Sequence, residues 1–358
     1  MKYPDILRLR LANQHISSNL FTKASQIVSS LGAIQAQDFA GAKWSLGLRS
    51  TKLSEKDIDQ AISDRSIVRS WPMRGTLHFV AAQDLHWMLS LLAPRILAKS
   101  AGRNRQLALD QKILDQCKDL LIQTMTGNQF LTRTEVYNLL ENQNISTAEQ
   151  RGIHILNYLA MNRVICHGPH LEKQPTYVLL DEWVSSPAIL SEEESLHQIA
   201  LTFFTSHGPA TLQDFIWWTG LTITLAKKAL SSVASRLSSV VVDANSYWFS
   251  PELPDLIPSK TVHILPGFDE YMLGYTNREL MVAKSQLSKI VPGNNGMFMP
   301  TIVIDGKVVG LWKRTLKKDQ VYIELQPFDP LSKSNLDKLQ KVALRYGKFL
   351  NKEAVINL

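Results

Sequence analysis

The sequence predicts an α+β fold in which three winged-helix units precede a small β-rich region. One order of elements, a capped helix, a short break, a second helix and two strands, is found three times along the chain. From about residue 259, short strands separated by tight turns replace this order. The 358 residues also exceed what one hydrophobic core usually holds. We therefore expect four segments, at residues 1–110, 111–190, 191–258 and 259–358.

The clearest copy lies in the middle of the chain. Thr132 to Glu135 is typical of a capping box, in which a hydroxyl and a carboxylate bond the free amides of a helix start. Apolar residues then follow at helical spacing. The predicted segments are helices around 133–140 and 153–160, strands at 164–166 and 177–180, and a polar loop that opens at His167-Gly168-Pro169.

The third copy repeats this order. Thr211 can cap a helix that Gly220 ends, and a second helix follows around residues 225–230. Strands at 240–242 and 247–249 then flank a hairpin turn.

The first copy is less regular. Ile27, Val28 and Leu31 share one helix face, which stops near Gly32. The predicted later segments are strands at 67–71 and 76–80, a wing at Met73-Arg74-Gly75 between them, and a further helix around 85–92.

The C-terminal region is predicted to be a small sheet or barrel closed by a helix. A short strand covers 262–265, and strands at 300–304 and 307–312 flank Asp305-Gly306. Such a two-residue hairpin turn requires positive φ angles. Another strand at 321–325 and a last helix around 336–346 complete the region.

Composition narrows the class of protein. Lys and Arg outnumber Asp and Glu by 39 to 32, which favours a polyanionic partner such as nucleic acid, although a basic soluble protein is the alternative. Cys117 and Cys166 form no CxxC pair, and histidines do not cluster with them, so we expect neither a disulfide nor a bound metal. No apolar run approaches the roughly 18 residues that cross a bilayer, and the N-terminus lacks a signal-peptide core. We expect a cytoplasmic protein without a membrane partner.

Four segments together resemble a known family. They are residues 31–38, 73–78, 265–271 and 300–310. In this order and spacing they resemble the winged-helix DNA glycosylases of the AlkZ/YcaQ type, across roughly residues 5 to 345. The resemblance implies three winged-helix units and a C-terminal β-barrel around a DNA-binding channel. It also implies release of N7-alkylated purines and, in some members, unhooking of interstrand crosslinks.

The family's catalytic motif is Gln-x-Gln in the AlkZ branch and Gln-x-Asp in the YcaQ branch. This chain has Gln35-Ala36-Gln37, so the resemblance makes Gln35 and Gln37 the catalytic residues. Residues two positions apart share one side of an extended segment but lie about 200° apart on a helix. If both glutamines face one lesion, the segment is therefore not a regular helix. The alternative is two surface glutamines near a helix end.

Basic residues supply candidate DNA contacts. Lys43, Arg69 and Arg74 flank the first unit, and Arg151 and Arg163 bracket the second unit's recognition helix. Each could bind phosphate or belong to a solvated basic surface.

Other polar and aromatic residues have structural alternatives. Asp38 is expected to be an N-cap or a solvent-facing residue rather than the catalytic acid. Asp269 and Tyr271 could line the channel or belong to the barrel core. His78 is expected to form structural hydrogen bonds, and Trp217 and Trp218 to lie in the core. The Asp305-Gly306 turn could probe DNA or close the barrel.

The sequence thus predicts a monofunctional DNA glycosylase that needs no metal or cofactor. Its expected partner is double-stranded DNA with alkylated purines, and we expect a monomer with no obligatory protein partner. The alternative is a non-catalytic winged-helix DNA-binding protein or transcriptional regulator, which the same units and charge would suit.

Overall fold

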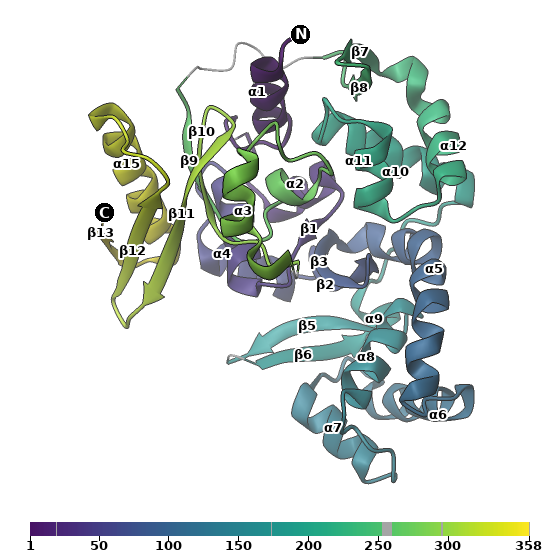
Figure 1. Cartoon of the computed structure of the whole chain (residues 1–358). Coiled ribbons are helices and arrows are strands. Elements are labelled where there is room, and N and C mark those ends of the chain that lie inside the picture. The colour runs from purple at the N-terminus through teal and green to yellow at the C-terminus, as the bar shows by residue number, and fades with distance from the viewer. Residues whose placement is uncertain (19, 173, 253–259, 295, 358) are drawn as a thin grey trace. The chain divides into compact units, whose positions relative to one another are not determined.

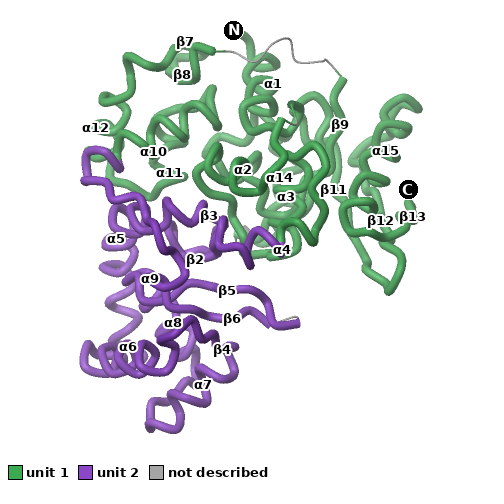
Figure 2. The backbone as a smooth tube through the Cα atoms, turned by 180° about the vertical axis from the view of Figure 1, so that it is seen from behind, with its two compact units in different colours: residues 1–58, 196–358 green, residues 59–195 purple. Residues whose placement is uncertain are grey.

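The computed structural model describes residues 1–18, 20–172, 174–252, 260–294 and 296–357. The chain divides into two compact units: unit 1 holds residues 1–58 and 196–358, and unit 2 holds residues 59–195 (Figure 2). The predicted boundary at residues 258 and 259 lies outside the described residues. Over the described ranges, every helix is too short or too polar to cross a membrane.

Unit 2 is built on an antiparallel sheet with helices around it (Figure 1). Within the unit the strands lie in the order β3-β2-β5-β6-β4. Arg69 lies opposite His167 where β2 meets β5. The elements are β2 (Ile67–Met73), β3 (Thr76–Ala81), α5 (Leu85–Gln106), α6 (Gln111–Met125), β4 (Leu131–Thr132), α7 (Arg133–Glu141), α8 (Arg151–Met161), β5 (Ile165–Leu171), β6 (Gln174–Leu179) and α9 (Leu180–Trp183).

Unit 1 joins both ends of the chain. Helices α4 (Glu55–Ser63) and α10 (Glu192–Ser206) contain the points where the chain passes between the units. The other elements are α1 (Tyr3–Asn13), α2 (Ala24–Leu31), β1 (Ile34–Gln35), α3 (Phe39–Leu48), α11 (Leu212–Thr219), α12 (Ile223–Val233), β7 (Ser238–Val242), β8 (Asn245–Phe249), β9 (Val262–Leu265), α13 (Glu270–Leu273), α14 (Leu287–Ile290), β10 (Thr301–Ile304), β11 (Lys307–Leu316), β12 (Gln320–Pro327), α15 (Lys333–Leu350) and β13 (Glu353–Asn357).

The repeated order of elements predicted from the sequence is confirmed. It runs α2-β1-α3-α4-β2-β3, then α6-β4-α7-α8-β5-β6, then α10-α11-α12-β7-β8. In the third copy, Ala210 takes the place of a short strand by pairing with Trp248 of β8. Both predicted caps form: Thr132 and Thr211 accept the N3 amide, and Glu135 and Asp214 bond back to the cap.

One predicted loop is wrong. His167, Gly168 and Pro169 lie inside strand β5, which continues to Leu171. The pairing with β6 shifts register between His167 and His170, so a β-bulge accommodates the Gly-Pro step without ending the strand. Turn-forming residues therefore mark an irregular strand here rather than a loop.

The C-terminal region is a curled half-barrel sheet in the order β13-β12-β11-β10-β9, and α15 packs against it (Figure 1). The Asp305-Gly306 turn has φ angles of 48° and 82°, as the sequence predicted. A side chain at Gly306 would come within 2.6 Å of Leu7, so the turn lies tightly against α1. Strand β13 was not predicted; it pairs parallel to β12 after α15.

An ion pair between Arg49 and Asp269 lies at the centre of unit 1. Both side chains are fully buried, and two N–H groups of the guanidinium each reach a different carboxylate oxygen at 2.8 Å. The Ser45 hydroxyl adds a third hydrogen bond to the carboxylate at 2.8 Å. Arg49 also donates to the Gln14 carbonyl, so the pair joins α1, α3 and the start of α13.

Replacing Asp269 with Ala should lower the free energy of unfolding by about 3–5 kcal/mol, because Arg49 would stay buried without a counterion. Asp38→Ala removes the partly exposed pair with Arg314 and should cost at most about 1 kcal/mol. Urea titrations of the two variants measure the difference. Equal losses would contradict the central role of the buried pair.

Candidate catalytic segment

The segment between α2 and α3 carries the two glutamines. Gly32 ends α2 with a φ of 81°, which turns the chain into strand β1. Gln35 is the last residue of β1, and α3 begins at Phe39 with Asp38 as its N-cap. The two glutamines thus lie on a non-helical stretch. A regular helix would have pointed their side chains about 200° apart, whereas this stretch allows both to face one lesion.

Gln37 lies in a connection that the other two copies lack. In the second copy, the short strand ends on Thr132, which is itself the N-cap of α7. In the third copy, the paired residue Ala210 directly precedes the N-cap Thr211. In the first copy, Ala36 and Gln37 separate the strand from the cap. The first copy therefore displays extra side chains at this junction.

The two glutamines differ in their surroundings. Gln35 is only 8% exposed, and its main-chain N–H donates to Oε1 of Glu270 at 2.9 Å. Gln37 is exposed to solvent. The first glutamine is therefore held within the fold, and the second lies at the surface.

Glu270 was not singled out by sequence reasoning. Its side chain is 0% exposed, and its second oxygen, Oε2, accepts from the indole N–H of Trp218 at 2.9 Å. His207 Nε2 lies 3.6 Å from the same oxygen. Glu270 does fall within the family-like segment 265–271, but 235 residues separate it from Gln35 in the chain. That distance in sequence hides the contact from any local pattern.

The neighbouring tryptophans have different environments. Trp218 is fully buried, as predicted, but Trp217 is 45% exposed, so the prediction of a core position for Trp217 was wrong. Successive helical residues point about 100° apart, which allows one of two adjacent tryptophans to leave the core. The Trp217 indole N–H still donates to the Leu273 carbonyl at 2.9 Å.

Asp38 lies at the N-cap of α3 but makes no side-chain capping bond. Its carboxylate instead approaches the Arg314 guanidinium at 3.4 Å. Gly41 makes room for it, since a Cβ there would lie 2.5 Å from an Asp38 oxygen. The carboxylate next to the motif is therefore engaged with β11.

Three other predicted site residues of unit 1 lie inside the fold. Asp269 is paired with Arg49, and the Tyr271 hydroxyl donates to the Gly306 carbonyl at 2.7 Å. Burial raises the pKa of Tyr271 strongly, so its hydroxyl stays protonated. Lys43 is 6% exposed, and its ammonium contacts Glu55 at 2.8 Å. Each of the three is bonded to a partner within unit 1, which does not favour a channel-lining or phosphate-binding role.

The predicted basic residues of unit 2 differ in accessibility. Arg69 is buried on β2, and Arg74 lies at the wing turn, where its guanidinium is 3.1 Å from Nε2 of the buried His78. Arg151 donates to the carbonyls of residues 107, 108 and 146 at the start of α8. Arg163 is exposed just after α8 and contacts the Ser90 hydroxyl at 3.1 Å. Arg163 is therefore the most accessible of these four.

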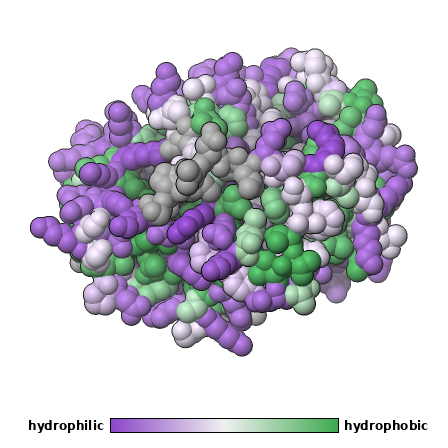
Figure 3. All heavy atoms as spheres, turned by 90° about the horizontal axis from the view of Figure 1, so that it is seen from above, coloured by the Kyte–Doolittle hydropathy of each residue, from purple (hydrophilic) through white to green (hydrophobic). Residues whose placement is uncertain are grey.

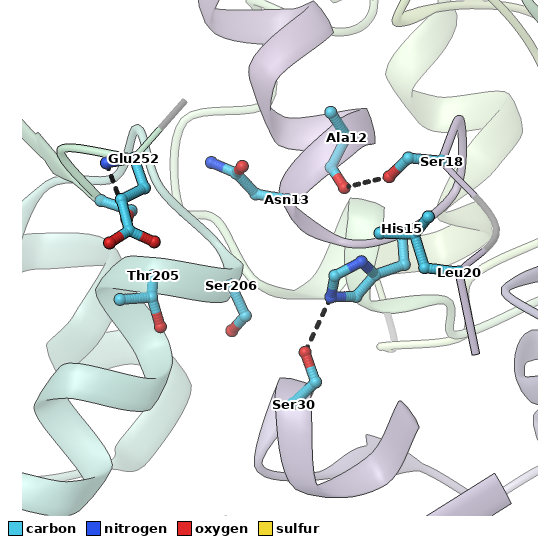
Figure 4. Close-up of a pocket in the computed structure, with 10 residues that line it drawn as sticks. Ala12, Asn13, His15, Ser18, Leu20, Ser30, Thr205, Ser206 and Glu252 are labelled. Atoms are coloured by element: carbon cyan, nitrogen blue, oxygen red, sulfur yellow. Dashed lines mark hydrogen bonds between the residues drawn. The ribbon is translucent and has the colours of Figure 1, made fainter. Parts of the chain in front are cut away.

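Unit 1 contains a cavity of about 630 Å³ (Figure 4), and neither Gln35 nor Gln37 is among its lining residues. Its walls include His15, whose ring nitrogen lies 2.7 Å from the Ser30 hydroxyl, and Ser206 of α10. Burial lowers the pKa of His15 to about 4, so the ring is neutral at neutral pH.

The face in Figure 3 is covered mainly by hydrophilic side chains, with small apolar patches between them.

The site offers hydrogen-bonding groups rather than a set of metal ligands. Among the described residues, no group of three or more His, Cys, Asp or Glu side chains is arranged to hold a metal ion. An amide carbonyl can hold a water, and an amide NH₂ can donate to an oxygen of a ligand. The segment can thus orient a water and a polar ligand without accepting a proton itself.

Comparison with known proteins gives consistent similarities. Residues 28–349 match the family described as DNA glycosylase AlkZ-like. The interstrand DNA cross-link repair glycosylase of Streptomyces sahachiroi is 26% identical over 321 residues, which cover 85% of each chain. The solved structure of Streptomyces sahachiroi DNA glycosylase AlkZ aligns with a TM-score of 0.82 and 22% identity over 99% of each chain. That last similarity shows a shared fold.

Proposed function

Because the chain belongs to the AlkZ-like DNA glycosylase family, we propose that it hydrolyses the N-glycosidic bond of N7-alkylated purines in double-stranded DNA. The similar Streptomyces protein is named for interstrand cross-link repair, which supports extending the substrates to bulky and crosslinked purines. In each of these substrates, the alkylated base is already a good leaving group before the enzyme acts.

The proposed substrate supplies much of its own reactivity. Alkylation at N7 makes the base cationic, so the leaving group needs no protonation. The remaining tasks are to place a water at C1′ and to stabilise an oxocarbenium-like sugar. An amide pair can do this by positioning, and positioning alone can contribute several kcal/mol. Such a site suits labile, cationic lesions and not undamaged bases.

We assign the two glutamines different shares of this work. The exposed Gln37 holds and polarises the attacking water through its carbonyl. Gln35, fixed through its main chain, donates from its NH₂ to a sugar or phosphate oxygen. Hydrolysis by water requires no covalent intermediate with a lysine, so we propose a monofunctional enzyme.

The observation that carries the proposal is the extra connection in the first winged helix. Ala36 and Gln37 are added where the other copies pass directly from strand to cap. A protein that used its winged helices only to bind DNA would not require this addition. Base release from DNA that contains N7-methylguanine tests the proposal, and tight binding without release would favour the non-catalytic alternative.

Gln37→Ala should lower single-turnover release of N7-methylguanine by 10-fold or more, on the order of a misplaced reacting group, while duplex affinity stays close to the parent's. Gln37→Asp should keep activity and gain a rate that falls as pH drops through the carboxylate's pKa, because the protonated acid cannot accept a proton from water. The rate of the parent should show no such decrease from this residue, because an amide does not titrate. If both variants release base at the parental rate, Gln37 is not catalytic.

Duplex affinity should fall with rising salt, with a log–log slope of about −0.9 for each phosphate neutralised. Arg163→Ala should make the slope shallower by about one, since this exposed guanidinium is our proposed phosphate contact. Binding titrations over a range of salt concentrations measure both slopes. An unchanged slope in the variant would remove Arg163 from the interface.

Base release should persist in EDTA. The cationic leaving group needs no Lewis acid, and the proposed water is held by amides. The measurement is the single-turnover rate with and without chelator after dialysis. A rate that collapses in EDTA and returns with zinc or magnesium would overturn this mechanism.

A further inference from the structure

We propose that Glu270 is the positioning residue of the Gln35-Ala36-Gln37 segment, which it holds through the main-chain N–H of Gln35. The inference rests on the proposed function for its effect on rate. The contact itself is between a fully buried carboxylate on α13 and the last residue of β1, at 2.9 Å.

Glu270 does not act on the substrate directly. Its side chain is 0% exposed, so neither water nor a nucleotide reaches its oxygens. A buried carboxylate is costly unless hydrogen bonds and charge compensate it. Here Oε1 accepts the N–H of Gln35, and Oε2 accepts the indole N–H of Trp218. The carboxylate is thereby tied to two segments of unit 1 at once.

His207 completes the site by a hydrogen-bond chain that fixes its tautomer. The Ser206 hydroxyl donates to the Thr202 carbonyl at 2.7 Å, so it accepts from Nδ1 of His207 at 2.8 Å. Nδ1 therefore carries a proton. Nε2, which lies 3.6 Å from Oε2 of Glu270, then bears a second proton when the ring is charged and a lone pair when it is neutral.

These contacts require two acceptors on the residue at position 270. A glutamine there has the same size but a single acceptor oxygen. If its oxygen faces Gln35, its NH₂ opposes the Trp218 N–H; if it faces Trp218, the NH₂ opposes the Gln35 N–H. Glu270→Gln must therefore lose one of the two bonds, and we expect the bond to Gln35 to be the one lost in most molecules, which releases the catalytic segment.

Removing the competing donor should reverse the loss. In the double variant Glu270→Gln with Trp218→Phe, the amide oxygen is free to accept from Gln35. The amide NH₂ can then donate to the lone pair of neutral His207. A glutamine pair that works by geometry alone is sensitive to such placement, since a displacement of about 1 Å can cost a factor on the order of 100 in rate.

The test compares single-turnover release of N7-methylguanine by the parent and four variants. Glu270→Gln should be slower than the parent by about 10- to 100-fold, with duplex affinity within about threefold. Trp218→Phe alone should be within about threefold of the parent, and the double variant should recover to within about fivefold. Trp312→Phe is the matched control, because it removes a comparable buried indole bond, to the Leu265 carbonyl at 2.7 Å.

Hydrogen exchange gives a readout that does not depend on activity. The Gln35 amide should exchange at least about 10-fold faster in Glu270→Gln and regain protection in the double variant, because protection reports the hydrogen bond itself. Trp312→Phe should leave this amide protected. If the parent releases no base while exchange behaves as expected, the proposed function fails and the positioning contact stands.

Two outcomes would overturn the role of Glu270. One is a parental rate and parental exchange at Gln35 in folded Glu270→Gln. The other is a double variant as slow and as unprotected as the single one, which would mean general loosening rather than positioning. If Glu270→Gln does not fold, Glu270→Asp replaces it: the charge and both acceptors stay, but the shorter side chain should withdraw from Gln35 and lose both rate and protection.

Discussion

A carboxylate removed from water must find compensating partners, and this requirement organises unit 1 around the adjacent residues Asp269 and Glu270. Asp269 satisfies it with the guanidinium of Arg49, which joins α1, α3 and α13. Glu270 satisfies it with N–H groups from β1 and α11. The next residue, Tyr271, bonds the turn between β10 and β11. Three consecutive residues thus connect segments from both ends of the chain to the start of one short helix. One of them, Glu270, bonds the glutamine segment directly.

The three winged helices show how one order of elements takes on different tasks. In the second and third copies, the strand passes straight into a capping threonine, and the side chains at that junction stabilise the following helix. In the first copy, Asp38 holds the cap position without capping, and its carboxylate turns to Arg314. The helix start loses a side-chain bond there, while the chain gains room for Ala36 and Gln37.

Local signals in the sequence predicted much of this fold. The capping box at Thr132, the cap at Thr211 and the positive-φ turn at Asp305 formed as expected, because each depends on residues a few positions apart. The glutamine motif was found by its resemblance to a family. The residues that hold the motif in place were not predicted. The contact between Gln35 and Glu270 and the pairing of Lys43 with Glu55 depend on tertiary packing, which no periodicity encodes. Trp217 and Trp218 show the same limit within a single helix turn.

The grip on Gln35 is through its main chain, and every amino acid except proline offers the same N–H group. The scaffold therefore places the segment without specifying which side chains it carries. The residue at position 37, and any residue except proline at position 35, can thus be exchanged without removing this main-chain hydrogen bond. A new side chain at position 37 can therefore change which lesion the segment acts on while the contact that positions the segment stays in place.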